Sequence, residues 1–68
     1  NLHDFIMPLL PLLDAGNLEV LDSLPSLARY AEQQETRNFK VEALALHIEK
    51  LEFEAAYKVA EDILKTQV

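Results

Sequence analysis

The sequence predicts an all-α fold, a small antiparallel four-helix bundle, on three observations. Apolar residues recur at the i, i+3, i+4, i+7 spacing of one-sided helices. No stretch shows the strict alternation of a β-branched run that a strand requires. The segments between the periodic stretches are short, which favours antiparallel neighbours. We therefore expect four helices over residues 7–15, 17–32, 38–51 and 53–66.

Two prolines and a glycine delimit the first expected helix. Pro8 and Pro11 lack an amide proton, which a helix tolerates only in its first turn, so we expect a start at Met7 or Pro8. Gly16 stands where a C-terminal cap requires a positive φ. Residues 2–7 form either a separate turn or part of a linker helix.

The second expected helix contains an internal proline. Asn17 is its N-cap, and apolar residues follow helical spacing from Leu18 to Ala31. Pro25 removes one backbone hydrogen bond and costs roughly 3 kcal/mol in a helix interior. Either the helix kinks there or two short helices meet, with Ser23 starting the second. We favour the kink, because the apolar phase continues past the proline.

The third expected helix, with Asn38 as its N-cap, carries two apolar stripes on nearly opposite sides. The main stripe consists of Val41, Leu44, Ala45, Ile48 and Leu51, and the second consists of Phe39, Ala43 and Leu46. Such a helix is either central to its bundle or half of an intermolecular contact, and we favour the central position. No glycine separates it from the fourth helix, so the break at residues 51–53 is inferred from a phase shift.

The fourth expected helix is the most regular. Its apolar residues fit one stripe about 120° wide at 100° per residue. They are Phe53, Ala56, Tyr57, Ala60, Ile63 and Leu64. Glu54 and Lys58 form an i, i+4 ion pair outside this stripe.

Length, charge and cysteine content restrict the class of protein. A chain of 68 residues forms a single helical domain over residues 1–68, with a small core. A net charge of −6 and six scattered basic residues exclude nucleic acid as a partner and disfavour anionic membrane surfaces. The absence of cysteine excludes disulfides and thiolate metal sites.

The longest apolar run is too short to cross a membrane. Residues 5–13 give only nine uncharged residues, including two prolines, where a span needs about 20. We expect a cytoplasmic protein or the cytoplasmic part of a membrane-anchored one. Because the sequence starts at Asn1 rather than Met, we expect it to be excised from a longer multidomain protein.

No recognisable catalytic, cofactor or metal motif is present. With one glycine there is no phosphate-binding loop, and no nucleophile–base signature is visible. Glu49, Glu52 and Glu54 are typical of a solvated helix face. His3 and Asp4 are two adjacent ligands, which do not make a metal site.

His47 is the one residue with a specific chemical alternative. It lies at the edge of the main stripe, where a phosphoacceptor histidine would be partly exposed. Phosphotransfer domains typically have His-x-x-Lys-Gly; here His47 and Lys50 match, whereas Leu51 replaces the glycine. An ordinary boundary histidine is the favoured interpretation.

The candidate interaction surface is apolar. It comprises Phe39, Ala43 and Leu46 of the third helix and Leu9 and Leu12 of the first. Self-association of the chain would use either Phe39 and Leu46 or the apolar strip over residues 8–13.

Two segments carry a family resemblance. Residues 44–64, LALHIEKLEFEAAYKVAEDIL, and residues 9–24, LLPLLDAGNLEVLDSL, resemble the C-terminal helical module that follows the receiver domain in bacterial hybrid sensor histidine kinases. The resemblance implies a regulatory domain of a two-component signalling protein, placed like a phosphotransfer domain. It also implies a receiver or kinase domain of the same pathway as partner.

We therefore expect a non-enzymatic regulatory or protein–protein interaction module of a two-component signalling protein, without cofactor or metal. The alternatives are a histidine phosphotransfer domain with His47 as phosphoacceptor and a self-association module.

Overall fold

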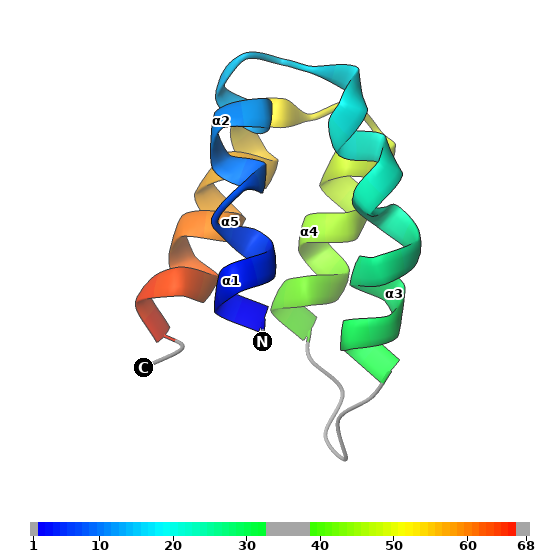
Figure 1. Ribbon diagram of the computed structural model, residues 1–68, viewed down its shortest axis with the longest axis vertical. Coiled ribbons are helices and arrows are strands. Elements are labelled where there is room, and N and C mark those ends of the chain that lie inside the picture. The colour runs from blue at the N-terminus through cyan, green and yellow to red at the C-terminus, as the bar shows by residue number, and fades with distance from the viewer. Residues whose placement is uncertain (1, 33–38, 67–68) are drawn as a thin grey trace.

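The chain forms an all-α bundle, as the sequence predicts (Figure 1). The computed structural model describes residues 2–32 and 39–66. Its elements are α1 (Leu2–Ile6), α2 (Leu9–Asp14), the 3₁₀-helix η1 (Leu18–Ser23), α3 (Leu24–Glu32), α4 (Phe39–Glu49) and α5 (Phe53–Thr66). They run as four antiparallel rods: α1 with α2, η1 with α3, α4, and α5. Within the described ranges no helix is long and apolar enough to cross a bilayer.

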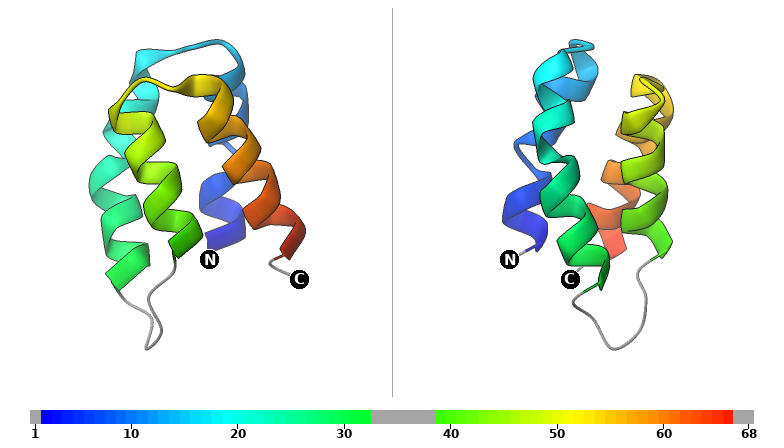
Figure 2. Two further views of the ribbon diagram at one scale, coloured as in Figure 1. Left: turned by 180° about the vertical axis from the view of Figure 1, so that it is seen from behind. Right: turned by 90° about the vertical axis from the view of Figure 1, so that its right-hand side faces the viewer.

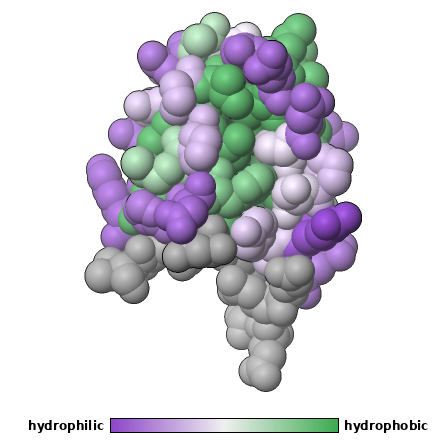
Figure 3. Space-filling model, viewed as in Figure 1, coloured by the Kyte–Doolittle hydropathy of each residue, from purple (hydrophilic) through white to green (hydrophobic). Residues whose placement is uncertain are grey.

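The four rods pack in a closed ring (Figure 2). α4 packs against both α3 and α5, and α5 packs in turn against α2 and α1. The ring closes where the Phe5 and Tyr30 side chains stack, with centroids 5.1 Å apart. Figure 3 shows hydrophobic side chains in the space between the first two rods, so side chains rather than backbone close this side of the bundle.

Every rod contributes buried aliphatic side chains to one core. The core residues are Leu2, Ile6, Leu9, Leu13, Val20, Leu27, Ala31, Val41, Leu44, Ile48, Ala56, Ala60 and Ile63. Their spacing follows the helical period within each rod. In α5 the buried side of the predicted stripe is made mostly of small residues, Ala56 and Ala60, which lets α2 and α4 approach its backbone closely.

The first rod begins earlier than the start predicted at Met7 or Pro8, because it includes the short helix α1. The second part of the rod, α2, starts at Leu9 with Pro8 as N-cap. Leu2, Ile6, Leu9 and Leu13 are buried at intervals of four, three and four residues. The break at Met7–Pro8 therefore preserves the helical phase, and the two short helices act as one rod.

Pro11 and Pro25 are accommodated by the same backbone arrangement. In a continuous α-helix, each proline would leave the carbonyl four residues earlier without a donor. Here the amide of the residue before each proline donates a hydrogen bond to that carbonyl: Leu10 donates to the Met7 carbonyl and Leu24 donates to the Leu21 carbonyl. Both are i→i−3 bonds of the 3₁₀ type.

The kink predicted within residues 17–32 is therefore wrong. The segment is a 3₁₀-helix followed by an α-helix, and Pro25 falls harmlessly in the first turn of α3. The buried Ser23 hydroxyl donates to the Val20 carbonyl at the junction. The role of Asn17 as N-cap is confirmed, since its side chain accepts from the Glu19 amide at 2.9 Å.

Two helices end in the same left-handed cap. After α2, Gly16 has a φ of 64°, as predicted, and the amides of Gly16 and Asn17 bond back to the Leu13 and Leu12 carbonyls. After α4, Leu51 has a φ of 62°, and the Leu51 and Glu52 amides bond back to Ile48 and His47. Both patterns are Schellman motifs. The predicted cap Asn38 lies outside the described residues.

The first prediction concerns Leu51. A left-handed backbone costs an L-residue about 1–2 kcal/mol, and glycine avoids this cost but has more freedom in the unfolded chain. Leu51→Gly is therefore expected to stabilise the fold by about 0.5–1 kcal/mol, or roughly 3–6 °C in Tm. Thermal unfolding followed by circular dichroism measures this. The control Glu49→Gly, inside α4, is expected to lower Tm. A lower Tm for Leu51→Gly would show that the leucine side chain outweighs the backbone strain.

The second prediction compares two leucines of α4. Leu44 is fully buried, whereas the Leu46 side chain is 54% exposed. Leu44→Ala is expected to reduce the free energy of unfolding by about 2–5 kcal/mol because it leaves a cavity. Leu46→Ala should change it by about 0.5 kcal/mol or less. Urea unfolding of both variants checks the assignment of the inner and outer faces, and equal losses would contradict it.

Candidate functional site

The outer face of α4 carries apolar side chains that are exposed to solvent. Phe39 is 72% exposed and Leu46 is 54% exposed, with the half-buried Ala43 between them. At 100° per residue these three lie nearly opposite the buried Val41 and Ile48. We call Phe39, Ala43 and Leu46 the α4 outer face.

This exposure corrects the prediction that the third helix is central to the bundle. α4 contacts α3 on one side and α5 on the other, and its inner stripe faces the core. No further element among the described residues covers its outer side. The second stripe therefore faces solvent, and the alternative of an intermolecular contact stays a prediction.

The other half of the predicted surface is not available to a partner. Leu9 is buried in the core, and Leu12 is half-buried and packs against it. The sequence could not show this, because the phase that α1 and α2 share across Met7–Pro8 decides which side of α2 is buried. Met7, at the break, is exposed instead.

Two other leucines are more exposed than their helical spacing predicts. Leu18, the first residue of η1, is 59% exposed. Leu51 is 48% exposed, because its left-handed φ takes it out of the α4 stripe to which the periodicity assigns it. Both lie at helix ends, where spacing no longer determines direction.

Charged residues border the α4 outer face in an ordered way. By helix geometry, Glu42 and Glu49 lie on one side of the stripe and Lys40 and His47 on the other. Lys40 Nζ lies 2.8 Å from Asp62 Oδ2, which ties α4 to α5. The border is therefore acidic on one side and basic or imidazole on the other.

His47 is held by a carboxylate from the turn after its helix. Its Nδ1 lies 2.8 Å from Glu52 Oε1, with side-chain exposures of 34% and 51%. Because an ionised carboxylate only accepts hydrogen bonds, Nδ1 is the donor. In a Schellman motif these two positions usually make an apolar contact, and here a polar pair replaces it. The pair helps to fix the α4–α5 turn.

The remaining histidine, His3, lies near the N-terminus beside an acidic residue. His3 Nδ1 lies 3.9 Å from Asp4 Oδ1, and both side chains are exposed. Over residues 2–32 and 39–66, no three or more His, Asp or Glu side chains are grouped so that they could hold a metal ion. Glu49, Glu52 and Glu54 are all exposed, as on a solvated face.

The third prediction tests the His47–Glu52 pair. A double-mutant cycle with His47→Ala and Glu52→Ala is expected to give a coupling energy of about 0.2–1 kcal/mol in the free energy of urea unfolding. The matched cycle with Glu49→Ala, an acid on the same helix that does not bond His47, should give a coupling energy near zero. Equal coupling in the two cycles would mean that the pair has no specific role.

Comparison with known proteins adds no relative to this geometry. No family model, no curated protein and no solved structure matches the chain. The resemblance to the helical module of hybrid sensor kinases therefore stays a prediction from residues 9–24 and 44–64.

Proposed function

We propose that this chain is a non-enzymatic regulatory module that binds another protein through the α4 outer face. One observation supports this most directly: Phe39 and Leu46 remain largely exposed on the side of α4 opposite its buried stripe. Burying a phenylalanine or leucine side chain is worth about 1.5–3 kcal/mol, so a partner that covers this face gains substantially.

The spacing of the face indicates how the partner binds. Phe39, Ala43 and Leu46 stand at i, i+4 and i+7, the anchor positions of a helix that lies in an apolar groove of another protein. The small Ala43 lets the partner's surface approach the helix backbone between the two larger anchors. The partner is therefore a folded protein with an apolar groove.

Charge and area favour a different protein over a second copy of this chain. Each copy carries a net charge of −6, and like charges oppose self-association. Three side chains on one helix offer on the order of 300 Å². A stable interface needs about 800 Å² on each side, so a dimer through this face alone would be weak. Transient contacts of this size suit regulation.

The resemblance supplies the candidate partner. It implies that the module sits in a cytoplasmic two-component signalling protein and contacts a receiver or kinase domain of the same pathway. Charges beside the anchors make the contact directional. A partner groove with basic residues facing Glu42 and Glu49 matches one orientation of α4 only.

Phosphotransfer through His47 is less well supported. The Glu52 carboxylate occupies its Nδ1, which leaves Nε2 as the nitrogen for a phosphoryl group. Glu52 brings a carboxylate to this position, and the negative end of the α4 dipole lies at the same place. Both oppose an additional anionic group, so a role in fixing the α4–α5 turn accounts better for His47.

The fourth prediction is the test of this function. In an amide chemical-shift titration of the ¹⁵N-labelled chain with a receiver domain, shifts are expected along the outer side of α4. Leu46→Asn should weaken binding about tenfold to a hundredfold, because it removes one buried anchor. The matched control, Leu18→Asn, changes an equally exposed leucine on η1 and should leave the affinity unchanged.

Other results would replace the proposal. Shifts centred on His47, with loss of phosphoryl transfer in His47→Gln, would establish the phosphorelay alternative. No shifts, together with a mass that rises with concentration and falls in Leu46→Glu, would establish self-association.

A further inference from the structure

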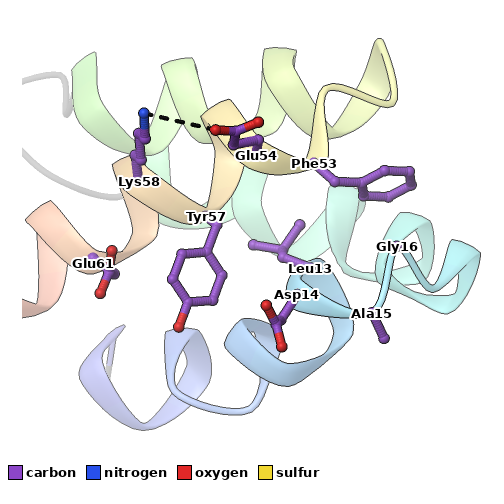
Figure 4. A pocket seen from close by; sticks show the side chains of 9 residues that line it. All are labelled: Leu13, Asp14, Ala15, Gly16, Phe53, Glu54, Tyr57, Lys58 and Glu61. Atoms are coloured by element: carbon purple, nitrogen blue, oxygen red, sulfur yellow. Dashed lines mark ion pairs between the residues drawn. The ribbon is translucent and has the colours of Figure 1, made fainter.

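A second surface feature lies away from the α4 outer face, where the end of α2 meets the first half of α5 (Figure 4). It is an open groove of about 490 Å³. Its apolar lining comes from Leu13, Phe53 and Tyr57, and the Phe53 ring lies over Gly16, where an added Cβ would stand 3.8 Å from the ring. The α2 cap and the aromatic residues of α5 thus line the same groove.

The polar lining of the groove is predominantly acidic. Asp14, Glu54 and Glu61 contribute three carboxylates, and Lys58 contributes the one cation among its lining residues. Lys58 Nζ lies 3.9 Å from Glu54 Oε1, so this cation is directed to the rim. Figure 4 shows the Tyr57 ring between the carboxylates of Asp14 and Glu61. In this view the groove presents an aromatic ring with a carboxylate on either side of it.

This combination fits a cationic side chain. A guanidinium group can stack on an aromatic face. It has five N–H donors and no acceptor, so it can contact the ring and donate hydrogen bonds to both carboxylates at once. The volume of the groove is at the small end of the range for ligand sites, about 300–1,000 Å³, which suits one or two side chains and not a whole helix. The net charge of −6 attracts basic segments to this surface.

We infer that the groove between α2 and α5 binds an arginine side chain of a basic, extended segment of another protein. Tyr57 provides the stacking face, and Asp14 and Glu61 provide the hydrogen-bond acceptors. This site involves none of the residues of the α4 outer face, so it stands or falls independently of the proposed function.

The test uses a short arginine peptide, acetyl-Gly-Arg-Gly-Arg-Gly-amide, and the same peptide with citrulline, which keeps the shape of arginine and removes its charge. In chemical-shift titrations of the whole chain, the arginine peptide should shift the amides of residues 13–16 and 53–61. The citrulline peptide should bind at least about tenfold more weakly, because it loses both charged contacts. A lysine peptide should bind more weakly than the arginine peptide, because ammonium cannot stack as a plane.

Matched variants separate a site from general attraction to an acidic surface. Glu61→Gln and Asp14→Asn should each raise the Kd about threefold, whereas Glu49→Gln, outside the groove, should leave it unchanged. Tyr57→Leu, checked for folding by circular dichroism, should raise the Kd as well. Equal effects of Glu49→Gln and Glu61→Gln, or equal binding of the citrulline peptide, would overturn the inference.

Discussion

The bundle depends on the burial of one stripe of α4. Val41, Leu44 and Ile48 are completely buried, and they face a core to which all other rods contribute. Because α4 packs against both α3 and α5, its inner stripe fixes the positions of two neighbours at once. A helix is rigid, so the direction of the inner stripe also determines that Phe39 and Leu46 point to solvent. The core and the candidate interaction face are two consequences of the same packing.

Elements with clear periodicity were predictable from sequence. The bounds of α5 are those expected, and Gly16 ends α2 as a left-handed cap. The two stripes of α4 were also visible, although the favoured prediction of a central helix, with both stripes covered, was wrong for the outer one. That choice depends on where the other rods pack, and it is a tertiary property.

The features that the sequence did not predict lie at helix ends or depend on residues that are far apart in the chain. A kinked α-helix and a 3₁₀-helix joined to an α-helix have nearly the same apolar spacing here, so the periodicity did not decide between the favoured kink and the alternative of two short helices that meet near Ser23. Leu51 has a left-handed backbone that local propensity disfavours, because the α4–α5 turn requires it. The groove brings together Asp14 and Glu61, which are far apart in the chain, so no local pattern could reveal it.

The order of the rods has a consequence for the assembly of the domain. The contacts of α4 with α3 and α5 join elements that are adjacent in the chain, whereas the contact of α2 with α5 joins opposite ends of it. Closing the long loop between α2 and α5 costs more entropy than closing the short loops beside α4. The groove exists only when α2 is docked on α5. A ligand that occupies it therefore stabilises the docked rod by mass action, so that ligand binding and docking of the rod are linked equilibria.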